Sequence, residues 1–188
     1  MNIINLLRRR IDEDRPVRAG LIGAGKFGSM FLAQVPHVRG LKVSASADLA
    51  REHGQTACRT VGWTDEQLEN TVYLENGIAL AARDDVDVVI EATGNPAVGI
   101  AHALAAIENG TQVVLVNVEA DVLAGAAIAK RARSAGVVYW MAYGDQPALV
   151  AEMVDWARAS GFQVTAAGKG TKYIPAFHEV SPDDVWRH

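Results

Sequence analysis

Residues 17–28, VRAGLIGAGKFG, decide the fold that we expect for this chain. The apolar first half predicts a buried strand, and residues 26–35 predict a short helix. The junction carries the pattern Gly-x-Gly-x-x-Gly, formed by Gly23, Gly25 and Gly28. Glycines at such a junction make a tight turn, admit a pyrophosphate close to the backbone and pack the helix against the strand. We therefore predict a nucleotide-cofactor site on these glycines and on Lys26 and Phe27, at the positive end of the helix.

An acidic residue stands where a dinucleotide site needs one. Asp48 lies 20 residues beyond Gly28, after a second strand predicted over residues 41–47. An acid at this place can accept a hydrogen bond from a ribose 2′-hydroxyl, and it repels a 2′-phosphate. The cofactor is therefore expected to be NAD or NADP, with NAD favoured by Asp48. Arg51 keeps NADP open because its guanidinium could pair with the phosphate, although a solvated helix arginine is the simpler interpretation.

Apolar runs alternate with helical segments along the chain. Strands are expected at residues 17–22, 41–47, 86–90, 112–116, 137–140 and 162–167. Helices are expected between most of them, at residues 26–35, 97–108, 121–135 and 147–160. Nearly continuous apolar strands indicate that helices cover both faces of a parallel sheet. The predicted fold class is therefore α/β, a Rossmann-type doubly wound parallel sheet with right-handed crossovers.

The stretch between Asp48 and Asp84 is longer than one crossover needs. Residues 64–67, Thr-Asp-Glu-Gln, have the spacing of a helix start, and residues 75–83 predict another short helix. We therefore expect a helical insertion after the second strand, either over the adenosine end of the cofactor or as a plain surface elaboration.

Whole-chain composition limits the classes of partner. The 188 residues are 49% hydrophobic and 21% charged, which is ordinary for a globular protein with a core. A net charge of −4 argues against a nucleic-acid or membrane-surface binder. The expected partner is a small-molecule substrate, with a homo-oligomer left open. One cysteine, Cys58, excludes an internal disulfide and indicates a reducing compartment, so the cytoplasm is expected. No stretch approaches the roughly 18–20 apolar residues of a membrane helix, and no histidine spacing indicates a metal site.

Three regions are predicted along the chain. Residues 1–15 are expected to form an amphipathic leading helix or arm, and residues 16–168 the NAD(P)-binding Rossmann domain. Residues 169–188 follow the last expected strand with a less regular pattern. We therefore expect them to begin a second domain.

The later turns carry a family resemblance. After the glycine pattern come EATG at residues 91–94, VNVEAD at 116–121, GDQP at 144–147 and GKGTKY at 168–173. This order resembles the homoserine-dehydrogenase superfamily. It is most similar to the branch that resembles deoxyxylulose-phosphate reductoisomerase in activity, whose members are often described as SAF-domain oxidoreductases. The resemblance covers residue 17 to the C-terminus.

The resemblance implies an NAD(P)-dependent oxidoreductase. Hydride transfer to or from a small carbonyl or hydroxy compound is the expected reaction, with the substrate phosphorylated or not and with or without a coupled isomerisation. A longer protein is also implied, whose substrate and dimerisation domain lies beyond this chain. Homoserine dehydrogenases carry a lysine where this chain has Glu119, and a carboxylate cannot replace an ammonium that polarises a carbonyl, so plain homoserine oxidation is not expected.

Four consecutive strands are expected to end in these turns at one edge of the sheet, where ligands of open α/β sheets bind. Thr93 and Gly94 are expected to line the nicotinamide ribose, and Asn117 and Gly144 to lie beside the nicotinamide. The residues predicted to be catalytic are Lys169, Asp145 and Glu119. A lysine there can polarise a substrate oxygen, while a carboxylate handles the proton.

Alternative interpretations remain for two residues, Asp121 and His102, and for the function of the chain. Asp121 is expected either as an acid–base group or as the N-cap of the next helix. His102 is expected to be structural or exposed. The other functions are an NAD(P)-binding sensor without catalysis, an S-adenosylmethionine-dependent methyltransferase and a structural subunit.

Overall fold

The computed structural model describes residues 3–144 and 146–168 of the chain. Its contacts divide the chain into two compact units, Met1–Ala142 and Tyr143–His188. The second domain that the sequence predicts from residue 169 onward lies outside the described residues. The first unit contains the sheet, and the second contains one described helix, α8 (Gln146–Ala159).

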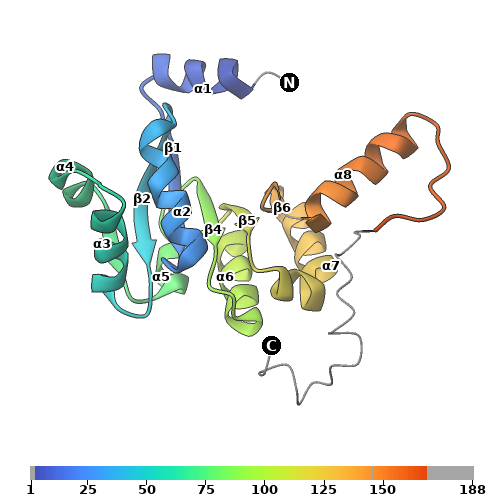
Figure 1. The fold of residues 1–188 in the computed structure, drawn as a ribbon. Helices are drawn as coiled ribbons and strands as arrows, with labels where there is room; N and C mark the ends of the chain where they lie inside the picture. Colours follow the sequence, from blue (N-terminus) through green and yellow to red (C-terminus); the bar gives the residue numbers. More distant parts are fainter. Residues whose placement is uncertain (1–2, 145, 169–188) are drawn as a thin grey trace, which may run out of the picture. The chain divides into compact units, whose positions relative to one another are not determined.

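A six-stranded parallel sheet forms the centre of the first unit (Figure 1). In chain order the strands are β1 (Val17–Ile22), β2 (Leu41–Ala47), β3 (Val72–Leu74), β4 (Val88–Glu91), β5 (Gln112–Leu115) and β6 (Tyr139–Met141). They lie side by side in the order β3-β2-β1-β4-β5-β6, and every neighbouring pair is parallel. The strand order reverses between β1 and β4, which is the switch point where open α/β sheets bind ligands.

Helices cover both faces of the sheet (Figure 1). In chain order the helices of the first unit are α1 (Ile3–Asp12), α2 (Lys26–Gln34), the 3-10 helix η1 (Val35–His37), α3 (Arg51–Thr60), α4 (Asp65–Glu69), α5 (Gly77–Ala81), α6 (Pro96–Glu108) and α7 (Val118–Ala135). One apolar core gathers Leu80 of α5, Ile107 of α6 and Ile128 of α7. The other gathers Leu32 of α2 and Cys58 of α3, and both of these side chains are fully buried. The predicted doubly wound α/β fold is therefore confirmed.

A bulge in β2 divides its side chains between the two cores. Ala19 of β1 pairs with Val43, whereas the next residue, Gly20, pairs with Ala45, so Ser44 is the extra residue. Val43 packs in the core of α2 and α3, and Ala45 packs in the core of α5, α6 and α7. Both faces of β2 are thereby buried up to the end of the strand.

The first two predicted strands, residues 17–22 and 41–47, are confirmed at both ends. The helices expected between β2 and β4 are also present, and Thr64 begins α4 with a capping box in which its side chain and that of Gln67 bind each other's backbone N–H. That region also contains a strand that the sequence analysis missed, because β3 has only three residues, too few to show alternation. β3 pairs with β2 and forms an edge of the sheet.

The strand expected at residues 162–167 is wrong. Residues 162–168 adopt no regular structure, and they follow α8 through Gly161, whose φ is +87°. The Phe162 side chain is 65% exposed, so this apolar run is not part of a buried core. An apolar segment forms a strand only where neighbouring backbone can complete its hydrogen bonds.

The expected leading helix is confirmed as α1, which is drawn at the top of Figure 1. Its last turn places the Arg10 guanidinium 3.5 Å from the carboxylate of Asp87, just before β4. Its backbone also passes close to Gly40, where a Cβ atom would lie 3.1 Å from the carbonyl oxygen of Leu7. None of the helices in the described part of the chain is both long and apolar enough to cross a bilayer.

Candidate functional site

The glycine loop between β1 and α2 has the geometry that its sequence predicts. Gly23 has a φ of +96°, and a Cβ there would lie 2.8 Å from the carbonyl group of Ala92. A Cβ on Gly28 would strike the carbonyl oxygen of Gly23, so this glycine allows α2 to start directly against the loop. Gly25 is different, because a Cβ there would have no other atom within 4 Å. The loop is therefore tight at both ends and leaves room at its middle glycine.

The amino end of α2 faces that room. Gly25 is the N-cap residue, and no side chain caps the first turn of the helix. The first backbone N–H groups of a helix lack partners within the helix and carry partial positive charge. Open space over such donors is what a pyrophosphate needs. Lys26 and Phe27, which begin α2, are both exposed.

Asp48 joins the end of β2 to the glycine loop. Its Oδ2 accepts a hydrogen bond of 2.7 Å from the backbone N–H of Ala24. Its Oδ1 accepts one of 2.7 Å from the N–H of Leu49 and lies 3.3 Å from Nδ1 of His53. The side chain is 17% exposed. A carboxylate offers about four acceptor positions, so Asp48 can support the loop and still accept from a ribose hydroxyl.

A hollow of about 540 Å³ lies over the carboxyl ends of β1, β2 and β4. The residues that line it include Gly23, Gly25, Asp48, Glu75, Asn76, Gly77, Thr93, Asn95, Val98 and His102. The structure thus brings three segments that the sequence analysis singled out, the glycine loop, Asp48 and the Thr93 turn, to one cavity. The segment from Glu75 to Gly77, which leads from β3 into α5, adds a further wall. It lies in the helical insertion that the sequence predicts either over the adenosine end of the cofactor or as a surface elaboration.

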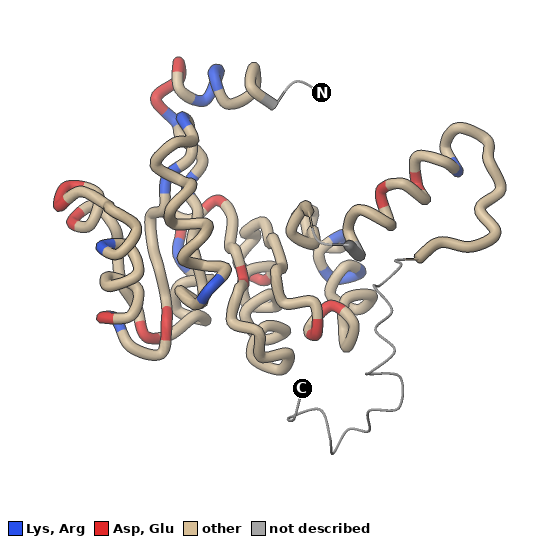
Figure 2. The backbone as a smooth tube through the Cα atoms, viewed as in Figure 1, with Lys and Arg blue, Asp and Glu red and all other residues tan. Residues whose placement is uncertain are grey.

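The end of this hollow that Asp48 lines is acidic. Figure 2 shows acidic positions at the turn that follows β2, where Asp48 lies. Glu75 lies on the wall of the hollow, and its Oε1 is 3.7 Å from Nε of Arg51. Both side chains of that pair are more than half exposed. The arginine nearest to Asp48 in sequence is therefore paired with a second carboxylate.

The turn that contains Thr93 is held by the buried side chain of Glu91. Glu91, the last residue of β4, is 0% exposed. Its Oε1 accepts hydrogen bonds from the Thr93 hydroxyl at 2.5 Å and the Thr93 N–H at 3.2 Å. Nδ1 of His102 lies 3.3 Å from the same oxygen. His102 is 7% exposed, so the structural interpretation of this histidine holds and the exposed one does not.

Glu91 is not among the site residues predicted from the sequence. The available signal was an acid at the end of an otherwise apolar strand, where a solvated turn residue is the ordinary interpretation. Only the fold shows that α6 covers the carboxylate completely.

Asn117 is a buried connector between β5 and the turn that follows β4. Its Oδ1 accepts from the N–H of Ala120 at 3.1 Å, so it caps α7. Its Nδ2 donates to the carbonyl oxygen of Asn95 at 2.8 Å. Asn117 is 2% exposed. The structure therefore places it behind the Thr93 turn, where it supports the turn from a buried position.

Asp121 is not the N-cap of α7, because Asn117 takes that position. Asp121 instead accepts a hydrogen bond of 2.6 Å from the Tyr139 hydroxyl of β6. Burial raises the pKa of Tyr139 above its usual range, and the hydrogen bond to Asp121 raises it further. Glu119 is exposed in the first turn of α7.

The remaining predicted site residues are placed as follows. Gly94 is exposed with a φ of +73°, beside Thr93. Gly144 belongs to the second unit and has a φ of +105°. Asp145 and Lys169 lie outside the described residues.

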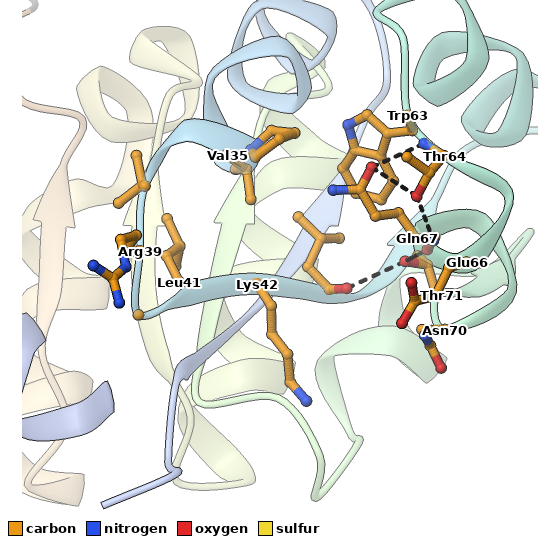
Figure 3. Close-up of a pocket in the computed structure, with 14 residues that line it drawn as sticks. Val35, Arg39, Leu41, Lys42, Trp63, Thr64, Glu66, Gln67, Asn70 and Thr71 are labelled. Atoms are coloured by element: carbon orange, nitrogen blue, oxygen red, sulfur yellow. Dashed lines mark hydrogen bonds between the residues drawn. The ribbon is translucent and has the colours of Figure 1, made fainter. Parts of the chain in front are cut away.

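A larger hollow, of about 690 Å³, lies at the amino end of β2 (Figure 3). It is lined by residues of β2 and of the segment around α4, with Trp63, Gln67 and Thr71 among them. Several of its polar groups already bind within the protein: the Trp63 indole donates to the Leu32 carbonyl at 2.8 Å, and the Thr71 hydroxyl donates to the Gln67 carbonyl at 2.9 Å. This hollow is at the edge of the sheet opposite to the glycine loop, so it is not the cofactor site.

Two family models match the chain. Residues 17–143 match the model described as "Oxidoreductase family, NAD-binding Rossmann fold". Residues 144–188 match the model described as "Oxidoreductase DRL, catalytic domain". The border between the two matches lies one residue from the division between the two compact units.

Two curated relatives and a solved structure extend these matches. A homoserine dehydrogenase from Neisseria gonorrhoeae is 30% identical over 112 residues, which are 55% of this chain and 23% of that protein. A 1-deoxy-D-xylulose 5-phosphate reductoisomerase from Heliobacterium modesticaldum is 31% identical over 118 residues, 61% of this chain and 30% of that protein. The structure of the WlbA dehydrogenase from Bordetella pertussis, in complex with NADH and UDP-GlcNAcA, matches with a TM-score of 0.58 at 19% identity, over 78% of this chain and 44% of that one.

These relatives confirm the predicted resemblance to homoserine dehydrogenases and to deoxyxylulose-phosphate reductoisomerases. The likeness to the solved structure shows the shared fold. The stretch matched in this chain spans less than a third of the length of either curated relative.

Proposed function

The chain belongs to the oxidoreductase family with an NAD-binding Rossmann fold, and we propose that it carries the cofactor domain of an NAD(P)-dependent oxidoreductase. The proposed reaction transfers a hydride to or from a small carbonyl or hydroxy compound. One observation carries the proposal: the glycine loop and Asp48 meet at the carboxyl edge of the sheet, joined by the hydrogen bond from Ala24 to Asp48.

The residues at this edge fit a nicotinamide dinucleotide. The backbone N–H groups at the start of α2 bind the pyrophosphate, and Gly25 leaves room for it. Asp48 accepts from the adenosine ribose, and Thr93 faces the nicotinamide ribose. The cofactor, when bound, supplies or takes up the hydride. The part played by the protein is to bind and orient both reactants.

We propose NAD as the preferred cofactor. Two carboxylates, Asp48 and Glu75, line the adenosine end of the hollow, and both repel a 2′-phosphate. Arg51, the cation that could hold that phosphate, pairs with Glu75 instead.

We propose that substrate chemistry belongs to the segment that matches a catalytic domain. Lys169 is the proposed group that polarises a substrate oxygen, and Asp145 or Glu119 is the proposed proton carrier. The reductoisomerase relative supports a phosphorylated substrate and a reduction coupled to isomerisation. The exposed position of Glu119 in the first turn of α7 leaves it accessible for such a role.

Titration of the full chain with NADH and with NADPH tests the cofactor assignment. Quenching of tryptophan fluorescence reports binding, and the titrations are repeated on Asp48→Ala. Wild type is expected to bind NADH more tightly than NADPH, and the variant is expected to lose about tenfold in NADH affinity, as one charged hydrogen bond predicts.

Asp65→Ala is the matched control, because Asp65 is an exposed acid in the first turn of α4. It is expected to leave both affinities unchanged. If wild type binds neither NADH nor NADPH, the proposed function is overturned. Unchanged NADH affinity in Asp48→Ala overturns only the role of Asp48.

A further inference from the structure

Glu91 is a fully buried acid at the end of β4, next to the proposed cofactor site. Removing a carboxylate from water is unfavourable unless hydrogen bonds replace the lost solvation. Oε1 of Glu91 has such partners in Thr93 and His102, whereas Oε2 has no hydrogen-bond partner among the residues that the structure describes. Well-packed apolar side chains often stabilise a protein as well as a buried charge does. Stability alone therefore gives no reason for an acid at this position.

The surroundings of Glu91 are fitted closely to it. A Cβ on Gly99 of α6 would lie 2.9 Å from Oε2 of Glu91, so this glycine allows the helix to pass directly over the carboxylate. A Cβ on Gly77 of α5 would strike the imidazole ring of His102. Two helices therefore approach the Glu91–His102 pair at glycines. The pair and its cover are a fitted unit rather than a loosely packed polar pocket.

Two buried side chains, Glu91 and Asn117, hold the two ends of the turn that follows β4. Glu91 holds Thr93 through its N–H and its hydroxyl. Asn117, itself capping α7, holds the carbonyl oxygen of Asn95 at 2.8 Å. The exposed residues of the turn line the hollow, whereas the groups that fix it lie behind.

The hydrogen bond to Glu91 also determines whether the Thr93 hydroxyl can donate to, or only accept from, a group in the hollow. The Thr93 hydroxyl donates its single proton to Oε1 of Glu91. The hydroxyl oxygen then presents lone pairs as acceptors, and the N–H of Asn95 lies 3.4 Å from it. One acceptor position remains for a donor in the hollow. A ribose hydroxyl is such a donor.

We infer that Glu91 is a positioning residue for the nicotinamide half of the cofactor: it fixes the Thr93 turn and commits the Thr93 hydroxyl to accept from the nicotinamide ribose. His102 helps to keep the carboxylate in place, because its Nδ1 lies 3.3 Å from Oε1 of Glu91. The inference rests on the proposed function, because it requires a nicotinamide dinucleotide on the glycine loop. It gives a role to Glu91 and His102, which lie outside the glycine loop.

Comparison of NADH with ADP separates this role from a general one in folding. ADP carries the adenosine and the pyrophosphate but lacks the nicotinamide half. The dissociation constants of both are measured for wild type, Glu91→Ala, Glu91→Gln and Thr93→Val, together with the thermal unfolding temperature of each. Glu108→Gln is the matched control, because Glu108 is an exposed acid at the end of α6.

Glu91→Ala is expected to weaken NADH binding about tenfold while ADP binding stays within about twofold of wild type. Glu91→Gln keeps an acceptor for Thr93 and is expected to recover most of the loss. Thr93→Val, at an exposed position, is expected to weaken NADH several-fold with little change in unfolding temperature, so it tests the inference even where Glu91→Ala folds poorly. Glu108→Gln is expected to match wild type.

An equal loss of NADH and ADP affinity in Thr93→Val and Glu91→Gln overturns the inference, since it indicates a role in folding alone. Unchanged NADH affinity in Glu91→Ala and Thr93→Val overturns it as well. In both cases the proposed function stands, because wild type binds the dinucleotide. If wild type binds none of NADH, NADPH and ADP, the proposed function is overturned. The inference is then overturned as well, because it depends on cofactor binding.

Discussion

The carboxylate of Asp48 and the backbone N–H of Ala24 are joined by a hydrogen bond of 2.7 Å. The bond connects the carboxyl end of β2 to the glycine loop that follows β1. Asp48 therefore has a structural task within the loop besides its proposed contact with the adenosine ribose. An acid in this position can fix the loop in the shape that a pyrophosphate needs before the cofactor arrives.

Asp48→Asn separates these two tasks. The asparagine carbonyl can still accept from Ala24, whereas its amide nitrogen cannot accept from Leu49, so a loss of about 1 kcal/mol of unfolding free energy is expected. Loss of the charge is expected to reduce the preference for NADH over NADPH about tenfold, because repulsion of the 2′-phosphate weakens. Urea unfolding and cofactor titration check the two parts. A selectivity equal to that of wild type contradicts the electrostatic role.

Substitution by alanine is expected to affect stability at Gly28 and cofactor affinity at Gly25. Gly28→Ala places a Cβ against the carbonyl oxygen of Gly23, so a loss of about 1–3 kcal/mol of unfolding free energy is expected. Gly25→Ala meets open space and is expected to cost less than about 1 kcal/mol. The new methyl group instead occupies the space at the amino end of α2 where the pyrophosphate is proposed to bind. NADH affinity is therefore expected to fall at least about tenfold. A stable Gly25→Ala protein that binds NADH normally argues against this place for the pyrophosphate.

Glu75→Gln tests the acidic wall of the hollow. The substitution frees Arg51 from its 3.7 Å ion pair and removes one of the two charges that repel a 2′-phosphate. Because both side chains are exposed, the gain in NADPH affinity is expected to be only about fivefold, near 1 kcal/mol. Glu66→Gln, an exposed acid of α4, is the control. Equal NADPH affinities in the two variants indicate that Glu75 does not influence cofactor choice.

The hydrogen bond from Tyr139 to Asp121 predicts a sensitivity to alkali. Tyr139→Phe is expected to cost about 1–2 kcal/mol near neutral pH. Burial and the bond to Asp121 raise the pKa of Tyr139 in the folded chain above the value of about 10 expected when unfolded. The folded form therefore binds this proton more tightly, and its stabilising effect is full below about pH 10 and declines as the pH rises further. Urea unfolding at about pH 8 and about pH 10.5 should show a smaller difference between wild type and variant at the higher pH.

Local pattern predicted the parts of the fold in which chain neighbours decide the structure. β1, β2 and the glycine loop follow from consecutive apolar residues and glycines, and the capping box at Thr64 follows from a spacing of three residues. β3 did not follow, because three residues become a strand only through pairing with β2. Residues 162–167 have a strand-like composition and lack such a pairing among the described residues.

The candidate site divides in the same way. Gly23, Gly25, Asp48 and Thr93 could be selected from motifs, and the fold gathers them around one hollow. Burial of Glu91 depends on α6 lying across the end of β4, which no spacing within residues 91–94 reports. Asn117, not Asp121, caps α7, and Asp121 accepts a hydrogen bond from Tyr139 of β6. No spacing within residues 116–121 reports that contact.

Asp87 binds β1 to the start of β4 at the edge remote from the cofactor, so its replacement tests the scaffold alone. Its carboxylate accepts from the N–H of Arg18 at 2.8 Å and from the guanidinium of Arg18 at 2.8 and 3.3 Å. These hydrogen bonds hold the pKa of Asp87 below its usual range, against the effect of burial. The stabilisation is therefore present above the unfolded pKa of about 4 and is lost as the pH falls below it.

Asp87→Asn is expected to lower the free energy of unfolding by about 1–2 kcal/mol at neutral pH. The difference from wild type should shrink as the pH falls below about 4, where the wild-type carboxylate becomes protonated. Asp84→Asn is the control, since Asp84 is exposed and only its backbone oxygen accepts from Arg18. NADH affinity is expected to stay at the wild-type value in both variants, because Asp87 and Asp84 lie at the amino ends of the strands. A fall in NADH affinity in the folded Asp87→Asn protein contradicts the separation of scaffold and site.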